Sequence, residues 1–350
     1  MATITTNAYG INSGGFNSPT GQVAYSGTAY SGAFIPALWS GKLAQKFYQA
    51  TVFGEIANTD WQGDITGMGD TVVINTIPSI TIRAYAAGQN LAYEVPVPST
   101  VTLSINKGQY FGVNVNNVLE LQSKPKLMDL FTNDAAMQMK ITIDKDVLSG
   151  TFNQGSSANI GAAAGIVSGS YNLGTDVAPI TLTAANILSS ITGMSSVLDE
   201  ANVPETDRWL IITPTERQLL MQSNLAQAQF MGDGSSMLRN GKIGMIDRFT
   251  VYVSNLTPRG AAGFTWNTAS NSYASSTTST NALKRHAVMA GHKSAITFAS
   301  QIAKVESLQN PNDFGTLIRG LNVYGYQVTG VNNVAPTQQG TGLTYLVVAN

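Results

Sequence analysis

Residues 71–105 read TVVINTIPSITIRAYAAGQNLAYEVPVPSTVTLSI, and this stretch decides the fold. Three short runs inside it, 71–74, 80–82 and 101–105, are rich in β-branched residues and bounded by Gly, Pro or Asn. That pattern is typical of strands. We therefore predict a long two-stranded excursion of the chain over residues 63–105, called the ribbon below.

The apolar side chains of the ribbon need more cover than two strands can supply. Ordering roughly forty residues costs on the order of 40 kcal/mol of backbone entropy, whereas burying the apolar side chains returns only about 20 to 40 kcal/mol. Isolated two-stranded ribbons are marginal in water. We expect a neighbouring copy to complete the ribbon, and an internal hairpin on the chain's own core is the alternative. The apolar members are Val72, Val73, Ile74, Ile77, Ile80, Ile82, Tyr85, Leu91, Tyr93, Val95, Val97, Val101, Leu103 and Ile105.

The segment before the ribbon is predicted to be an arm followed by a helix. Residues 1–32 are rich in Gly, Ser, Asn, Thr and Tyr and carry no charged side chain, which indicates an extended arm. A helix is expected over 36–49, because Pro36 suits a first helical turn and Leu38 and Phe47 fall near one face.

The longest helical pattern in the chain covers residues 126–148. Its apolar residues recur at steps of three or four, which predicts one buried stripe along a helix. Lys140 and Asp144 are four residues apart, and we expect them to pair on the exposed surface of this helix. The stripe consists of Met128, Phe131, Ala135, Met139, Ile143 and Val147.

After residue 150 helical and strand patterns alternate, which indicates a mixed α+β fold. A helix is predicted over 184–200, and a second one begins with a capping box at residues 213–216. Residues 260–281 are rich in Ser, Thr and Asn and are expected to form a surface loop inserted between two strands. Further strands are predicted at 209–212, 249–253, 287–290 and 321–328.

Charge and composition argue against several classes of protein. Of the 350 residues, 19 are Lys or Arg and 20 are Asp or Glu, so the basic footprint of a tight nucleic-acid binder is missing. Only 11% of residues are charged, about half the usual share, which suits a surface buried against other proteins. The start of the chain lacks the pattern of a secretory signal, and the long uncharged stretches are too interrupted by polar residues to predict a membrane span.

No catalytic, cofactor-binding or metal site is predicted. The chain has no Cys and two histidines, and His292 is expected to be a hydrogen-bonded residue at a strand end. Three aspartates at positions 60, 64 and 70 lie among glycines, but they lack the spacing of a calcium loop and are interpreted as turn residues. An enzyme would need paired carboxylates in a cleft, and a distant pair such as Glu200 and Glu205 stays open as an alternative.

Several strings, in this order along the chain, resemble the major capsid proteins of tailed bacteriophages with the Hong Kong 97-like fold. The resemblance covers about 34–330, with the ribbon and the long helix between the strings. The strings are ALWSGKL at 37–43, FYQATVFGEIANT at 47–59, GDTV at 69–72, DRWLIITP at 207–214, NGKIGMIDRF at 240–249 and GHKSAITF at 291–298.

The resemblance implies a domain plan and an assembly. Such proteins form hexamers and pentamers of themselves that build the icosahedral head around double-stranded DNA, in the virion, after assembly in the host bacterial cytoplasm. Contact with the packaged DNA would be weak and non-specific, no membrane would take part, and it stays open whether scaffolding, portal and cementing proteins do. The implied parts are an N-terminal arm (1–60), an extended β-hairpin loop (61–105), a peripheral domain with a long spine helix (106–179 and 296–330), an axial domain (180–295) and a C-terminal extension (331–350).

The expected contacts between subunits lie on the ribbon and the arm. Some members of the family lock the shell through a Lys in the extended loop, but residues 63–105 contain no Lys, so non-covalent locking is predicted. A surface-layer or other extracellular β-rich structural protein is the alternative, and a secretion signal would favour it. The contact residues expected are Phe34, Trp39, Phe47, Ile80, Ile82, Arg83 and Tyr85.

Overall fold

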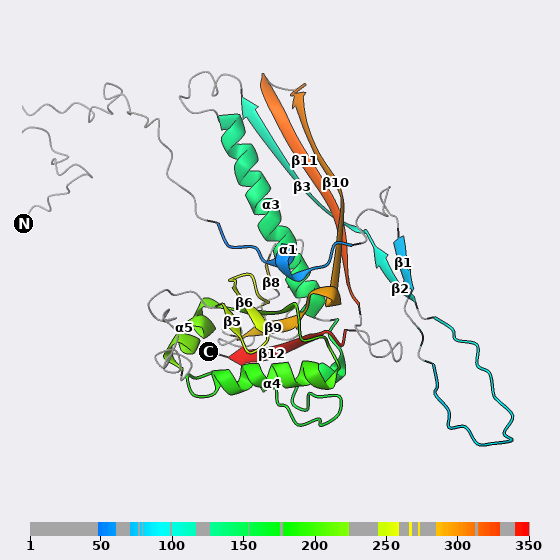
Figure 1. The fold of residues 1–350 in the computed structure, drawn as a ribbon. Helices are drawn as coiled ribbons and strands as arrows, with labels where there is room; N and C mark the ends of the chain where they lie inside the picture. The colour runs from blue at the N-terminus through cyan, green and yellow to red at the C-terminus, as the bar shows by residue number, and fades with distance from the viewer. Residues whose placement is uncertain are drawn as a thin grey trace, which may run out of the picture. The chain divides into compact units, whose positions relative to one another are not determined.

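Sheets of three and five strands, each packed against helices, dominate the computed structural model and make it the expected α+β fold (Figure 1). The expected arm, most of the expected helix at 36–49 and most of the expected loop at 260–281 fall outside the described residues. Tyr48 and Gln49, the two described residues of that helix, are not helical. The residues described are 48–60, 71–75, 78, 80–98, 100–116, 127–152, 154–175, 178–223, 244–258, 266–267, 272–273, 285–311, 314–329 and 340–349.

The three-stranded sheet consists of β3 (Lys107–Asn116), β10 (Ile296–Gln309) and β11 (Gly315–Val328), in the antiparallel order β10-β11-β3. The sequence predicts only the second half of β11. It misses β3, which contains two Gly and two Asn, and β10, which contains two Ala, one Lys and one Glu, because all of these residue types are poor strand formers. Pairing with β11 on both sides overrides that weak local preference.

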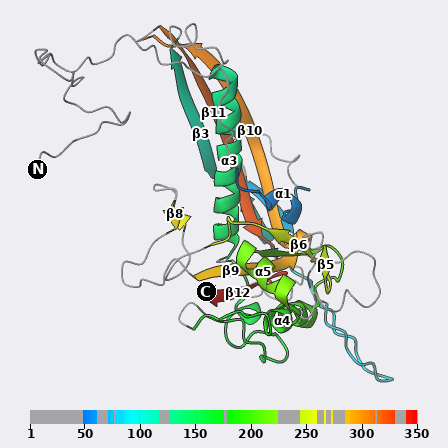
Figure 2. The same cartoon turned by 90° about the vertical axis from the view of Figure 1, so that its left-hand side faces the viewer.

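The long helix is confirmed as α3 (Leu127–Phe152), which lies along one face of the three-stranded sheet (Figures 1 and 2). Its two halves differ. In the first half the expected stripe is partly open, and Phe131 keeps 42% of its surface exposed. In the second half almost every side chain is buried, because α3 there also meets the five-stranded sheet and the short helix α1 (Phe53–Ile56).

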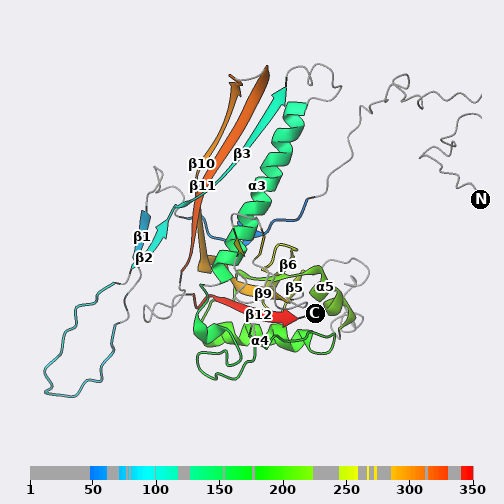
Figure 3. The same ribbon diagram turned by 180° about the vertical axis from the view of Figure 1, so that it is seen from behind.

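The five-stranded sheet has the order β12-β9-β4-β6-β5, in which only β4 and β6 are parallel. Figure 3 shows β5, β6, β9 and β12 together at one end of α3. Its central strand is buried on both faces. Trp209 and Ile211 pack with the end of α3, whereas Leu210 and Ile212 pack with the helix α4 (Ile187–Glu200). The strands are β4 (Arg208–Ile212), β5 (Met245–Ile246), β6 (Phe249–Val253), β9 (Arg285–His292) and β12 (Leu343–Ala349).

Strands predicted at 209–212, 249–253 and 287–290 are confirmed within this sheet. The helix predicted from residue 184 begins three residues later, as α4 (Ile187–Glu200). The capping box is confirmed at the start of α5 (Pro214–Gln222), where Thr213 and Glu216 exchange hydrogen bonds. Smaller elements are η2 (Ser157–Asn159), η5 (Lys293–Ala295) and the two-residue strands β7 (Trp266–Asn267) and β8 (Ser272–Tyr273).

The last strand corrects one expectation. Residues 331–350 are expected to be an extension beyond the family pattern, yet β12 pairs with β9 along its whole length and buries most of its side chains. Its sequence, LTYLVVA, is apolar, but it follows a polar stretch, so the sequence does not indicate that it belongs to the sheet. Burial against β9 and α4 explains why this strand belongs to the core.

The ribbon is a shorter sheet than the sequence predicts. β1 (Thr71–Asn75) and β2 (Thr100–Ser104) pair antiparallel and confirm two of the expected strands. The third, at 80–82, is wrong, because residues 80–98 contain no strand. Pro78, Pro96 and Pro98 have no backbone N–H to donate, so a continuous ladder cannot form there.

Candidate assembly surfaces

The base of the ribbon packs on its own chain. Leu103 and Ile105 are fully buried against Ala299 and Val323 of the three-stranded sheet, and Val72 adds a partly buried contact. At this end the internal-hairpin alternative is correct. The base therefore needs no second subunit for its stability.

The rest of the ribbon, residues 80–98, has no such cover from the described part of the chain, and we call it the tip. Ile82 is 90% exposed, Tyr93 89% and Val95 88%. Large apolar side chains rarely stay this exposed over a contiguous stretch unless a partner covers them. The exposed apolar residues of the tip are Ile80, Ile82, Tyr85, Leu91, Tyr93, Val95 and Val97.

Covering the seven apolar side chains of the tip would contribute on the order of 10 kcal/mol before the cost of association is subtracted. That is large compared with the net stability of a typical domain. The tip is therefore the strongest candidate for an interaction surface among the described residues.

Polar contacts hold the shape of the tip. Arg83 lies 3.8 Å from Glu94, and Glu94 also accepts a hydrogen bond from the backbone N–H of Thr81 at 2.6 Å. That hydrogen bond is the main reason why the pKa of Glu94 is lowered. Arg83 is expected to meet a carboxylate of a neighbour, but within the subunit it already faces Glu94.

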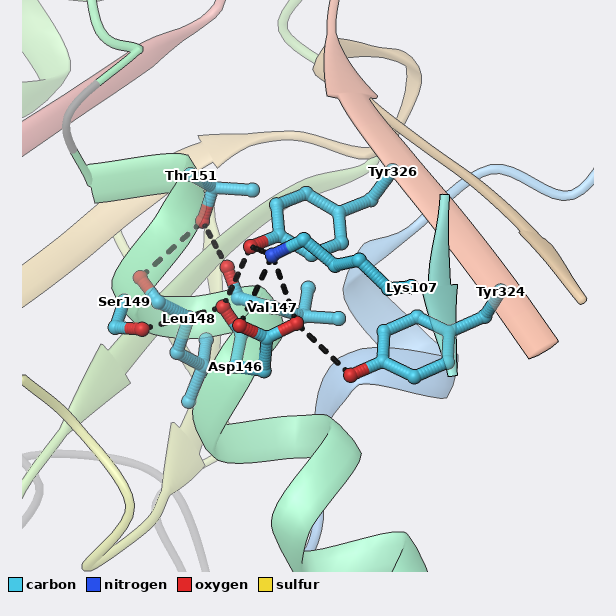
Figure 4. A network of polar contacts seen from close by, with 8 residues as sticks. All are labelled: Lys107, Asp146, Val147, Leu148, Ser149, Thr151, Tyr324 and Tyr326. Carbon is cyan, nitrogen blue, oxygen red and sulfur yellow. Dashed lines mark hydrogen bonds and ion pairs between the residues drawn. The ribbon is translucent and has the colours of Figure 1, made fainter. Parts of the chain in front are cut away.

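Where the ribbon joins the body, a polar network replaces the apolar contacts (Figure 4). Lys107 Nζ donates to the two carboxylate oxygens of Asp146 at 3.0 and 2.9 Å and to Tyr326 Oη at 2.6 Å. The Tyr324 hydroxyl donates to the same carboxylate at 2.8 Å. Burial, reinforced by the charge of Asp146, raises the pKa of both tyrosines, so both hydroxyls keep their protons. Sequence reasoning misses this network, because its members are up to 219 positions apart.

A second carboxyl on α3 corrects another expectation. Asp144 is not on the surface with Lys140 but fully buried, and it accepts hydrogen bonds from the backbone N–H groups of Val52 and Phe53 at 3.2 and 2.9 Å. Burial raises its pKa to about 7, although these two hydrogen bonds act in the opposite direction. The carboxyl therefore ties the segment before α1 to the long helix.

The exposed face of the three-stranded sheet carries a shallow groove of about 400 Å³. Tyr110, 81% exposed, and Leu321 form its apolar part. Its polar part is Glu306 between two cations, Lys304 and Arg319, whose hydrogen bonds lower the pKa of the glutamate. The groove thus offers apolar contacts and charges of both signs side by side.

The histidines have structural roles. His292 lies at the end of β9, and its Nδ1 is 2.7 Å from the Ser294 hydroxyl, which confirms the expected hydrogen-bonded histidine at a strand end. His286 is buried, with Nε2 2.6 Å from Glu216 Oε1. Burial opposes ionisation of Glu216, but the hydrogen bond and charge of His286 outweigh it and lower the pKa of Glu216.

The two carboxylates left open for an enzyme are each engaged by the fold. Glu200 accepts hydrogen bonds from the backbone N–H groups of Val167 and Ser168, both at 3.0 Å. Glu205 lies 3.3 Å from Arg248. In the described ranges no cluster of three or more side chains could hold a metal ion, and no described helix is both long and apolar enough to cross a bilayer.

Of the expected contact residues, those on the arm, Phe34, Trp39 and Phe47, lie outside the described residues. Those on the ribbon, Ile80, Ile82, Arg83 and Tyr85, all lie on the exposed tip. Whether they contact a neighbouring subunit stays a prediction. Sequence reasoning could have found Tyr110 as an aromatic residue in a polar strand, but nothing local points to Lys107 or Asp146.

Comparison with known proteins shows which solved structures share this fold. No family model and no curated protein matches the sequence. Among solved structures, a chain of Mycobacterium phage Che8 is 23% identical, with a TM-score of 0.67 over 91% of this chain and 98% of that one. A chain of the capsid structure of the cyanophage P-SCSP1u is 17% identical, with a TM-score of 0.62 over 95% and 99%.

A chain of the head structure of the Helicobacter pylori bacteriophage KHP40 is 10% identical, with a TM-score of 0.62 over 93% of this chain and 98% of that one. The similarity in each case extends over nearly the whole of both chains, although few residues are identical. The chain therefore has the Hong Kong 97-like fold of tailed-bacteriophage capsid proteins.

Proposed function

We propose that this chain is the major capsid protein of a tailed bacteriophage, assembling as hexamers and pentamers into the icosahedral head that encloses double-stranded DNA. The fold supports this function. The observation that carries the proposal is the apolar tip of the ribbon, which the described part of its own subunit leaves uncovered. A surface of this kind is expected in a protein that functions only when it is packed against copies of itself.

In the assembled shell, the tip of one subunit would lie on the groove of the next. Tyr110 and Leu321 would cover apolar side chains of the tip. Arg83 and Glu94 carry opposite charges, and the groove has a glutamate between two cations, so the two surfaces can be aligned with unlike charges facing. The arm residues Phe34, Trp39 and Phe47 would add further contacts between subunits.

The remaining partners follow from the same proposal. The protein would be located in the virion and assembled in the host cytoplasm. With a net charge of −1, its contact with the packaged DNA would be weak and independent of sequence. Scaffolding, portal and cementing proteins would be additional partners of the shell.

Electron microscopy of the purified chain in negative stain tests the proposal. We expect closed shells, or tubes of the same subunits. Filaments or flat lattices would favour the surface-layer alternative, and a chain that stays monomeric at all concentrations would contradict the proposal.

The role of the tip is tested by changing Ile82, Tyr93 and Val95 together to Ser. Because these side chains are almost fully exposed, the subunit should keep its circular dichroism spectrum and its melting temperature. Particle formation, measured by light scattering, should be lost or reduced at least tenfold, since the apolar surface is gone.

A matched control changes three other exposed residues of the same tip, Ala87, Asn90 and Ala92, to Ser. This variant removes little apolar surface and should assemble as the parent chain does. If both triple variants assemble normally, the tip is not a contact surface.

A further inference from the structure

The ribbon leaves the body of the subunit at a very short joint. β2 ends at Ser104 and β3 begins at Lys107, so only Ile105 and Asn106 lie between the two sheets. The pairing of β3 with β11 starts at Lys107 itself, opposite Tyr324. On this strand, a change in the angle between ribbon and body would take place next to Lys107.

Lys107 is held there by contacts with two elements, α3 and β11. Its ammonium group bonds both carboxylate oxygens of Asp146 on α3 and the hydroxyl of Tyr326 on β11, and it lies 4.2 Å from the centre of the Tyr326 ring (Figure 4). Asp146 is buried, and Tyr324 donates to it from the other side. The first residue of β3, two positions after the end of the ribbon, is thus bonded to both the helix and the sheet.

The backbone around the joint is packed without free space. A Cβ atom on Gly325 would lie 2.3 Å from the carbonyl oxygen of Ser104, so the end of β2 crosses directly over β11. A Cβ atom on Gly150 would lie 1.8 Å from the Tyr326 hydroxyl, which needs this space to reach the backbone carbonyl of Asp146. The close packing at the joint therefore requires glycine at both positions, 325 and 150.

We infer that Lys107 is a positioning residue for assembly, whose salt bridge with Asp146 holds the ribbon at one angle to α3 before a neighbouring subunit arrives. The inference rests on the proposed function. The tip has no cover from the described residues of its own subunit, so its direction must be set at the base. A surface that is oriented in advance loses less conformational freedom when it binds.

A purely structural role is the simpler alternative, in which the salt bridge stabilises the fold and has no effect on the ribbon. When both charges are removed, a positioning role predicts a change in the angle of the ribbon, whereas a purely structural role predicts none. Changing Lys107 to Met alone would leave Asp146 buried without its cation and could unfold the subunit. The test variant is therefore the double change Lys107→Met with Asp146→Asn, which leaves no charge unpaired.

The angle of the ribbon can be measured directly, because the chain has no Cys. Changing the exposed residues Val73 on β1 and Gln138 on α3 to Cys allows a spin label at each position. Pulsed electron resonance then reports the distribution of distances between ribbon and helix in unassembled subunits, below the concentration at which light scattering detects particles.

We expect one narrow distance distribution in the parent chain and in Lys107→Arg, which keeps the charge. The double variant should give a distribution at least twice as wide and should assemble at least tenfold more slowly. Tyr326→Phe removes a single hydroxyl from the network. Its distribution width and its assembly rate should lie between those of the parent chain and the double variant, which keeps the inference testable if the double variant does not fold.

The matched control is Arg248→Met, in the turn between β5 and β6, which removes the ion pairs of Arg248 with Asp199 on α4 and with Glu205, away from the ribbon. It should change neither the width of the distribution nor the assembly rate. A double variant with an unchanged distribution would overturn the inference, and so would a broadened distribution with normal assembly. A parent chain that forms no particles contradicts the proposed function instead, since the distance measurement does not depend on assembly.

Discussion

The carboxyl group of Asp144 lies inside the subunit, where the last turns of α3 meet the segment that leads into α1. Two backbone N–H groups bond it, but in the described residues no cation forms a salt bridge with it. An unpaired buried carboxylate is unfavourable, which is why the pKa is raised to about 7. This residue therefore makes the stability of the subunit depend on pH near neutrality.

The sign of this dependence follows from the two states. The unfolded chain releases the proton of Asp144 near its ordinary pKa of 3.8, whereas the folded subunit keeps it up to about pH 7. The free energy of unfolding should therefore decrease as the pH rises between these values, by up to about 4 kcal/mol in total.

Changing Asp144 to Asn should remove this loss, because the amide oxygen can accept a hydrogen bond without carrying a charge. In urea unfolding of unassembled subunits, the variant should match the parent near pH 4.5 and exceed it by about 1 to 3 kcal/mol at pH 8. Asp129→Asn, at an exposed position in the first turn of α3, is the control and should leave the pH profile unchanged. A variant that is less stable than the parent at pH 8 would show that the charged carboxylate stabilises the fold.

At the tip of the ribbon, the change Arg83→Glu should leave the subunit folded and weaken particle formation, because a cation in the expected contact surface is replaced by an anion. Particle yield by sedimentation is the measurement. The exchange Arg83→Glu with Glu94→Arg separates the two explanations. If it restores assembly, the salt bridge inside the tip is what matters; if it does not, Arg83 acts toward a neighbour.

At the scale of elements, the ribbon is divided by its own composition. β1 and β2 carry aliphatic residues that pack against the three-stranded sheet, so the base is part of the core. Prolines interrupt the tip, which keeps its apolar side chains but cannot extend the ladder. An element can thus be half core and half contact surface.

Gly325 tests the close crossing at the base of the ribbon. Replacing it with Ala would place a methyl group 2.3 Å from the backbone of Ser104, so we expect the subunit to lose about 1 to 3 kcal/mol of stability in urea unfolding. Gly112→Ala, on β3 of the same sheet, has nothing within 4 Å of the added methyl group and should be neutral or slightly stabilising. Equal effects of the two changes would mean that the crossing is not tightly packed.

At the scale of the whole molecule, positive and negative charges nearly cancel. Many copies can then be packed together without strong mutual repulsion. The net charge says nothing about where the charges lie, but the groove and the tip each carry charged side chains in a fixed local arrangement. Pairs of unlike charges between neighbouring subunits would thus align them, whereas the near-zero net charge only allows the subunits to approach one another.

Particles of this chain should be held together without covalent bonds, because residues 63–105 contain no Lys that could form an amide with a neighbour. Boiling in detergent should release a single band at 36.9 kDa on a denaturing gel. As a control, particles treated with an amine-reactive cross-linker should give a ladder of covalent multimers on the same gel. A ladder from untreated particles would refute the prediction.

The sequence by itself determined the elements whose pattern is local. The period of α3, the capping box of α5, the strands of the ribbon and three strands of the five-stranded sheet could all be predicted, because neighbours along the chain decide them. The same holds for the unusual number of apolar residues in the tip. Each of these features repeats within a few residues, which is the range that helix and strand preferences cover.

The tertiary structure alone decided which polar groups are buried and what they contact. Asp144 and Asp146 look alike in the sequence, yet one ties down the segment before α1 and the other anchors the ribbon. The same is true of β3, β10 and β12, whose pairing partners supply what their own composition lacks. The physical reason is that the environment of a side chain is set by segments up to 219 positions away, which no local pattern contains.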